Sequence, residues 1–197
     1  MSVRLLAFSD VHRDLRQAGR LADRAGEVDV VVAAGDFASV HRGLEDLIDM
    51  LAVIETPTVL VPGNNETDEA LREACKGWPA ARVLHGEGME IDGVSFFGLG
   101  GGVPVTPWDW SFDLTEQEAA DRLAACPSGG VLVVHSPPKG YVDGSRRLGS
   151  EAILAAIEDK QPRLVLCGHI HEAAGEEATV GASRVLNVGP AGVVLEV

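Results

Sequence analysis

The chain has 197 residues, of which 46% are hydrophobic, and a formal net charge of −14 at pH 7. This length and composition predict one domain, residues 1–197, with a single substantial core. The negative charge repels nucleic-acid phosphates and excludes a general DNA- or RNA-coating role, although a bound cation could still attract a small phosphorylated substrate.

Two features of the sequence favour a cytoplasmic location. Residues 1–4 lead straight into an apolar stretch, without the charged region and cleavage site of a signal peptide, and no run reaches eighteen apolar residues. Cys75, Cys126 and Cys167 are odd in number and form no CxxC pair, which is typical of reduced thiols. We therefore expect a cytoplasmic protein without a membrane segment.

In the first third of the sequence, apolar strands alternate with amphipathic helices. We expect strands at 4–10, 28–36 and 56–64, and helices at 15–26 and 41–55. This alternation predicts right-handed βαβ units and a parallel sheet covered on both faces. Each strand ends in polar residues, at the edge where open α/β sheets carry their sites.

The rest of the chain combines hairpins with further strand–helix pairs. Residues 89–100 predict a hairpin about Asp92-Gly93, and Thr115 with Glu118 is placed as a capping box at the start of a helix over 114–125. Further elements are strands at 131–138 and 162–172, a helix at 149–159, and antiparallel strands within 178–197.

Candidate metal ligands gather at the predicted strand ends. They are Asp10, His12, Asp36, Asn64, His135, His169 and His171. Carboxylate, amide and imidazole donors favour Mn²⁺, with Fe, Zn²⁺, Co²⁺ or Ni²⁺ as alternatives, and seven donors suffice for two divalent ions that share a ligand. If the chain keeps strand geometry beyond 167, His169 and His171 point the same way and can reach adjacent ions.

Each of these residues also has an ordinary explanation. Asp10 and Asp36 could cap the helices that follow them, and Asn64 could be a turn residue. Those explanations do not account for the fact that four of the six histidines fall in three strand-end clusters. We therefore predict a metal centre.

The motifs D-x-H, G-D, G-N-N-E, H and G-H-x-H, spread from Asp10 to His171, resemble the signature of the calcineurin-like metallophosphoesterases. The resemblance implies an α/β fold, a four-layer αββα sandwich with two mixed β-sheets. It also implies a dinuclear site in which Asp36 bridges the two ions. One ion would be held by Asp10, His12, Asp36 and His171, and the other by Asp36, Asn64, His135 and His169.

The chain departs from the family pattern at two positions. A histidine that contacts the scissile phosphate usually follows the ligand asparagine, and Asn65 stands there. An amide can donate a hydrogen bond but cannot deliver a proton, so Asn65 is a candidate substrate contact. Glu66 either orients this loop or is a helix-start acid. Arg13, where glycine is usual, is either a phosphate contact or an ordinary exposed arginine.

The resemblance implies phosphoric ester hydrolysis by attack of a metal-bridging hydroxide, with Asn65 and Glu66 as the candidate catalytic residues. The missing histidine favours substrates whose leaving group departs easily, so we predict a phosphodiesterase for small or cyclic-nucleotide-type diesters. A phosphomonoesterase and a non-catalytic metal-binding or protein-interaction module are the alternatives. Trp108 and Trp110 are either a base-stacking wall or ordinary packing. The sequence leaves the oligomeric state open, a homodimer being one alternative.

Overall fold

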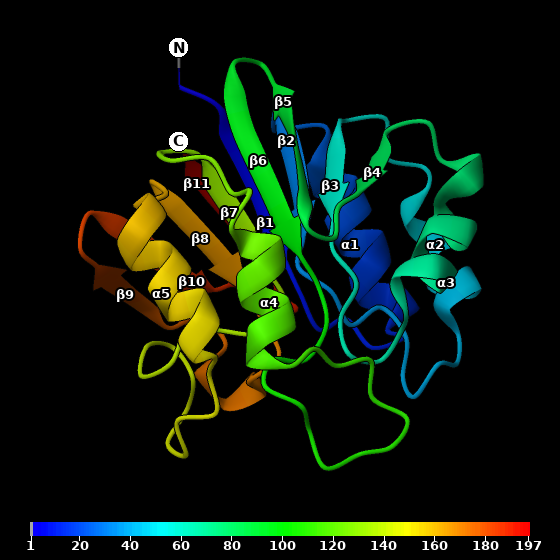
Figure 1. The fold of residues 1–197 in the computed structure, drawn as a ribbon. Helices are drawn as coiled ribbons and strands as arrows, with labels where there is room; N and C mark the ends of the chain where they lie inside the picture. Colours follow the sequence, from blue (N-terminus) through cyan, green and yellow to red (C-terminus); the bar gives the residue numbers. More distant parts are fainter. Residues whose placement is uncertain (1) are drawn as a thin grey trace.

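The computed structural model describes residues 2–197 as two stacked β-sheets with helices on both outer faces (Figure 1). The first sheet has the order β11-β1-β2-β3-β4, in which β1 to β4 are parallel and β11 runs antiparallel to β1. Its strands are β1 (Arg4–Phe8), β2 (Val30–Ala33), β3 (Thr58–Leu60), β4 (Ala81–Val83) and β11 (Val193–Glu196).

The second sheet is mixed and has the order β5-β6-β7-β8-β10-β9. Strands β6, β7, β8 and β10 are parallel to one another, and β5 and β9 are antiparallel at the two edges. The strands are β5 (Glu87–Ile91), β6 (Val94–Leu99), β7 (Val131–Val134), β8 (Leu164–Cys167), β9 (Glu177–Val180) and β10 (Ser183–Asn187).

Helices cover the outer face of each sheet. The first sheet carries α1 (Leu15–Ala25), α2 (Leu44–Leu51) and α3 (Asp68–Ala74), and the second carries α4 (Glu116–Leu123) and α5 (Glu151–Lys160). Two short 3₁₀ turns are η1 (Cys75–Gly77) and η2 (His171–Ala173). The Thr115–Glu118 capping box forms at the start of α4 as predicted.

Three apolar layers hold these four structural layers together. Successive residues of a strand point to opposite faces, so Leu6 packs beneath the helices of the first sheet and Leu5 packs between the sheets. On the far side, Ile157 of α5 packs against Val165 of β8. The predicted four-layer αββα sandwich is therefore confirmed.

Two elements were not predicted from the sequence: the helix α3 and the strand β4. Both lie between Glu66 and Glu87, and they extend the first sheet by one parallel strand. The tail is more complex than a simple set of antiparallel strands. Strand β10 pairs antiparallel with β9 but parallel with β8, and β11 crosses to the first sheet.

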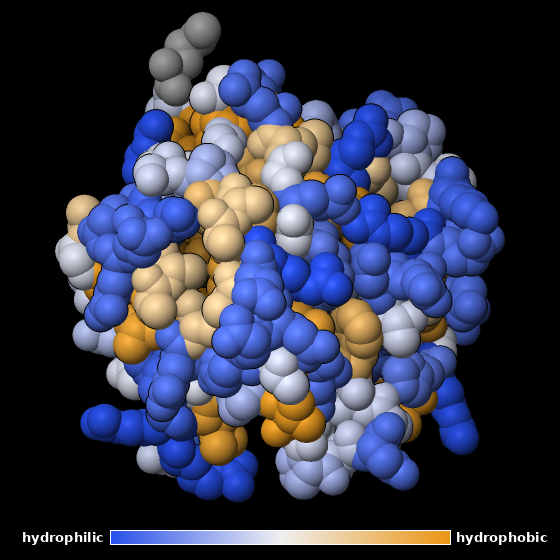
Figure 2. All heavy atoms as spheres, viewed as in Figure 1, coloured by the Kyte–Doolittle hydropathy of each residue, from blue (hydrophilic) through white to orange (hydrophobic). Residues whose placement is uncertain are grey.

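The face seen in Figure 2 is mostly hydrophilic, in keeping with 30 acidic against 16 basic residues. A paler apolar strip lies over α4 and α5, where alanine side chains line a groove between the two helices. Within residues 2–197, no helix has the length and apolar character that a membrane crossing requires.

Candidate metal centre

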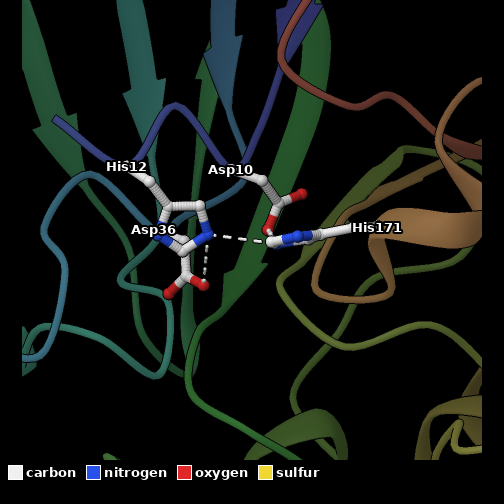
Figure 3. A group of neighbouring side chains, drawn as sticks. All are labelled: Asp10, His12, Asp36 and His171. Carbon is white, nitrogen blue, oxygen red and sulfur yellow. Dashed lines mark hydrogen bonds and ion pairs between the residues drawn. The ribbon is translucent and has the colours of Figure 1, made fainter. Parts of the chain in front are cut away.

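The carboxyl ends of β1, β2, β3, β7 and β8 meet at one edge of the sandwich, and the polar residues that follow these strands converge there. Donor atoms of Asp10, His12, Asp36 and His171 form one group, and those of Asp36, His135 and His169 form a second, with the donors of each group within 4.8 Å of one another. Figure 3 shows the side chains of the first group pointing toward a common centre. Asp36 belongs to both groups.

The first group combines two imidazoles with two carboxylates. The Nε2 atom of His12 lies 3.1 Å from Nε2 of His171 and 3.4 Å from Oδ2 of Asp36. Nε2 of His171 lies 3.7 Å from Oδ1 of Asp10. Four donor atoms from three segments of the chain therefore face one small volume.

The second group uses the other oxygen of Asp36. Oδ1 of Asp36 lies 3.5 Å from Nε2 of His135. The amide oxygen of Asn64 joins this group, because it lies 3.3 Å from Nε2 of His135 and 3.1 Å from Nδ1 of His169. Asp36 thus offers one oxygen to each group, which is the arrangement that a bridging ligand requires.

The ring tautomers of two histidines fit metal binding. Nδ1 of His12 lies 3.0 Å from the carbonyl oxygen of Ala38, and Nδ1 of His135 lies 2.8 Å from that of Ala34. A carbonyl only accepts hydrogen bonds, so both rings carry their proton on Nδ1 and direct the Nε2 lone pair into the site. Two divalent ions match this set of hard and borderline donors.

The pKa values of two ligands favour the metal-binding forms. Burial raises the pKa of Asp10, but His171, His135 and Ser9 outweigh it and bring that pKa to about 2, so the carboxylate is charged. Burial, together with His135, lowers the pKa of His169 to about 4, so this imidazole is neutral. Metal ligands must be deprotonated, and both residues meet this condition near neutral pH.

Several candidate ligands have backbone conformations that residues other than glycine rarely adopt. Asp10, His12, Asp36 and His169 all have positive φ, between 42° and 68°. Residues other than glycine in this region typically cost about 1–3 kcal/mol each and cluster at functional sites. Hydrogen bonds between the loops, such as His12 N–H to the Asp36 carbonyl at 3.0 Å, hold this geometry.

The strand predicted at 162–172 ends earlier than expected. His169 and His171 do not continue a strand, because β8 ends at Cys167, His169 is left-handed and η2 begins at His171. The two imidazoles nevertheless reach adjacent groups. Asn187 supports this turn, since its side-chain amide donates to the carbonyls of Gly168 and Ile170 at 3.2 and 3.0 Å.

The alternative in which the two aspartates cap helices is wrong. Asp14, not Asp10, caps α1, and Gly43 occupies the N-cap position of α2. The helix-start reading of Glu66 is wrong as well, because α3 begins after the N-cap Thr67.

Glu66 instead connects the loop after β2 with the loop after β3 through hydrogen bonds. It is 1% exposed and accepts hydrogen bonds from four backbone N–H groups, those of Asp36, Phe37, Ala38 and Gly63. Burial and the Asp36 carboxylate raise the pKa of Glu66 to about 7, while the four N–H donors favour its charged form. Gly63 lets the loops approach, because a Cβ there would collide with Asp36 Oδ1.

Asn65 also faces Asp36. Its side-chain N–H donates to Oδ2 of Asp36 at 2.8 Å, its backbone N–H donates to Oδ1 at 2.9 Å, and its own Oδ1 accepts from Val40 N–H at 2.9 Å. These contacts favour a role in positioning Asp36 over the predicted contact with substrate. The Arg13 side chain lies against Gly43 at the start of α2.

The residues that orient Asn64 carry no motif in the sequence. The Asn64 amide N–H donates to Ser111 Oγ at 2.9 Å, and Ser111 Oγ–H donates to Asp113 Oδ1 at 2.7 Å. These bonds fix which end of the Asn64 amide faces the histidines. Nε2 of His41 lies 2.6 Å from the carbonyl oxygen of Trp110 in the same loop.

Sequence comparison identifies known proteins that are similar to this chain. The chain is 29% identical over 195 residues to the UPF0046 protein K07C11.7 of Caenorhabditis elegans, covering 88% of this chain and 65% of that protein. It is 35% identical over 83 residues to metallophosphoesterase domain-containing protein 1 of Homo sapiens, covering 38% of this chain and 26% of that protein. The chain thus spans less than two thirds of the length of either relative.

Solved structures share the fold. The protein TT1561 of Thermus thermophilus superposes with a TM-score of 0.80 at 21% identity, covering 97% of this chain and 91% of that one. A dimetal phosphatase from Danio rerio gives a TM-score of 0.65 at 13% identity, covering 94% and 86%. The family model for the calcineurin-like phosphoesterase superfamily domain matches residues 3–196. The chain therefore belongs to the calcineurin-like phosphoesterase superfamily.

Proposed function

We propose that this protein hydrolyses small phosphodiesters with the help of two divalent metal ions, Mn²⁺ being the expected metal. Support comes from the two donor groups that share Asp36 and from the family to which the chain belongs. Metal ions bound there would supply Lewis-acid chemistry, acidifying water and neutralising charge on phosphate oxygens. The expected partner is a small phosphorylated substrate.

The chain's own residues keep the donors in place before any ligand arrives. His12 and His135 are fixed by backbone carbonyls, Asn64 by Ser111, and Asp36 by Asn65. A preorganised polar site stabilises developing charge without reorganising during the reaction. This rigidity supports catalysis over the alternative of a non-catalytic module.

The preference for diesters rests on the hydrogen bond that the Asn65 side chain donates to Asp36. An amide held in this way delivers no proton to a leaving group, and such assistance typically contributes about 10²–10⁴ in rate. Phosphoryl transfer from monoesters has a loose transition state with much charge on the leaving oxygen. A diester also carries less negative charge than a monoester dianion, which matters for a chain of net charge −14.

Assays of the Mn²⁺-loaded protein test this function. We expect kcat/KM to be higher for bis-p-nitrophenyl phosphate and strained cyclic nucleotides than for p-nitrophenyl phosphate or alkyl monoesters. Chelation and His135→Ala should abolish turnover, while His85→Gln, which changes a histidine outside the site, should retain it. Faster monoester cleavage would establish a phosphomonoesterase, and a metal-loaded protein without turnover on any ester would favour the non-catalytic module.

We also propose a cytoplasmic location. The three cysteines, Cys75, Cys126 and Cys167, are free and buried, which suits a reducing compartment. Fractionation of cells that produce the protein, with detection of the native chain, tests this location. Recovery in a membrane or secreted fraction would contradict it.

A further inference from the structure

A cavity of about 510 Å³ opens beside the metal centre. His169 and His171 line it, so the cavity is continuous with both groups of donors. Residues 104–108 form one wall, and Arg146 and Leu148, from the loop before α5, also line it. In Figure 1 the segments carrying these walls, green and yellow, both lie below the strand ends.

The wall formed by residues 104–108 contains an indole ring that is exposed to solvent. Trp108 is 50% exposed and lines the cavity, whereas Trp110 is half-buried and does not line it. The two rings stack with centroids 5.5 Å apart and planes 12° apart. Trp110 therefore packs against one face of the Trp108 ring, while half of the Trp108 residue stays exposed at the cavity.

Hydrogen bonds connect the wall formed by residues 104–108 to the loop that carries Asn64. Asp113, which accepts from Ser111 Oγ–H, also accepts from the backbone N–H and the hydroxyl of Thr106, both at 2.7 Å. Ser111 accepts in turn from the ligand Asn64, and Phe112 N–H donates to the Asn64 carbonyl at 2.9 Å. The loop that carries Trp108 is thus tied by hydrogen bonds to the segment that carries Asn64.

The second wall carries charges of both signs, because the exposed residues Arg146 and Glu172 both line the cavity. Within residues 2–197, no hydrogen bond or ion pair engages the Arg146 guanidinium, which is exposed at the cavity. Its neighbour Ser145 is anchored, because Ser145 N–H and Oγ–H donate to Glu172 Oε1 at 2.6 and 2.9 Å. In a chain of net charge −14, this arginine favours the approach of an anionic substrate.

We propose that the cavity binds the organic substituent of the phosphoric ester and that this substituent is a planar aromatic ring, stacked on the exposed indole of Trp108. Trp108 is then a specificity-determining residue. The inference rests on the proposed esterase function and narrows it to esters that carry an aryl group or a nucleobase. Stacking on an aromatic side chain typically contributes about 1–3 kcal/mol per ring, which is roughly 5- to 150-fold in affinity.

A pair of non-hydrolysable ligands isolates the ring from the phosphorus group. Calorimetric titration of the Mn²⁺-loaded protein should give tighter binding of phenylphosphonate than of methylphosphonate, by about tenfold. Trp108→Leu keeps apolar volume but removes the aromatic face, so it should remove most of this difference while leaving methylphosphonate affinity unchanged. Trp108→Phe should restore much of it.

A second pair separates the two sources of an aromatic ring. If adenosine 5′-monophosphate binds more tightly than ribose 5-phosphate in a Trp108-dependent way, the ring is a nucleobase. If only the phenyl pair discriminates, the ring is a small aryl group. Equal affinities within both pairs, or discrimination that survives Trp108→Leu, would overturn the inference.

The binding readout separates this inference from the proposed function. Trp108-dependent discrimination in a metal-loaded protein that cleaves no ester would retain the aromatic subsite and remove the esterase. Diester turnover with no preference for aromatic ligands would retain the esterase and remove the subsite. Failure of both phosphonates to bind the metal-loaded protein would contradict the subsite.

Discussion

The Asp36 carboxylate contacts residues of both donor groups. Its two oxygens face different donor groups, and both also accept hydrogen bonds from Asn65. Its backbone N–H is held by Glu66, and its φ of 60° is left-handed. The orientation of the carboxylate shared by the two donor groups therefore depends on Asn65 and Glu66, which belong to neither group.

Glu66→Gln should be strongly destabilising. A glutamine places its own N–H₂ group against two of the four backbone N–H donors that the carboxylate now satisfies. Each buried donor left without an acceptor costs about 1–3 kcal/mol. We expect the free energy of unfolding to fall by roughly 3 kcal/mol in urea denaturation, together with weaker Mn²⁺ binding.

Glu69→Gln is the matched control for that substitution. Glu69 lies on the exposed side of α3, three residues further along, and the exchange removes the same charge. Its unfolding free energy should stay within about 0.5 kcal/mol of wild type. Equal effects of the two substitutions would show that Glu66 does not fasten the loops.

Asn65→Ala tests whether the amide positions Asp36 or contacts the leaving group. Loss of the donor to Asp36 Oδ2 should lower the Mn²⁺ affinity by about tenfold, because supporting hydrogen bonds to ligands typically contribute 10- to 100-fold. The dependence of rate on leaving-group pKa, measured with aryl diesters at saturating metal, should keep the wild-type slope. A changed slope with unchanged metal affinity would restore the leaving-group role predicted from the sequence.

At the scale of elements, the sequence predicts best where an apolar run ends in polar residues or where an amphipathic pattern repeats. The strands that become β1, β2 and β7 are short apolar runs that end in polar clusters, and α1 and α2 have clear amphipathic patterns. The helix α3 was missed because its 7 residues are too few for a helical pattern to repeat, and β4 was missed because Arg82 interrupts its apolar residues. The passage of β11 to the first sheet depends on tertiary pairing that local sequence does not encode.

The same limit applies to the site. Its ligands are recognisable because each follows a strand within a short motif. Ser111 and Asp113 lie 47 and 49 positions after Asn64, and they are ordinary loop residues until the fold brings them beside it. The stacking of Trp108 on Trp110, left open by the sequence, likewise depends on a loop whose path Asp113 and His41 set.

Ser111→Ala should loosen the loop that carries both Asn64 and the tryptophans. Without the hydroxyl, the Asn64 amide loses its orienting acceptor and Asp113 loses a donor. We expect Mn²⁺ affinity to fall by about tenfold, with a smaller change in thermal stability, since this loop lies at the periphery. Ser128→Ala, on an exposed turn, should leave both quantities unchanged. Identical metal binding in the two variants would contradict the orienting role.

At the scale of the molecule, the metal centre joins the two sheets. Asp10, Asp36 and Asn64 follow strands of the first sheet, while His135 and His169 follow strands of the second. The buried carboxylates of Asp10, Asp36 and Glu66 also place negative charge together in a chain of net charge −14. Divalent cations at this position would both neutralise that charge and link the sheets.

Metal removal should therefore lower the melting temperature. Ligands that bind only the folded state stabilise it by about 2.7 kcal/mol at a hundredfold excess over Kd, and each kcal/mol shifts Tm by roughly 2–4 °C at this chain length. We expect Mn²⁺ to raise Tm by about 5–10 °C over the chelated protein in differential scanning calorimetry. Asp36→Ala removes the shared ligand, so metal analysis should fall from about two ions per chain to none and the rise should vanish. Asp23→Ala, on the exposed face of α1, should keep the full rise. A Tm that does not respond to Mn²⁺ in the wild-type protein, with folding intact, would mean that the seven donors do not bind metal.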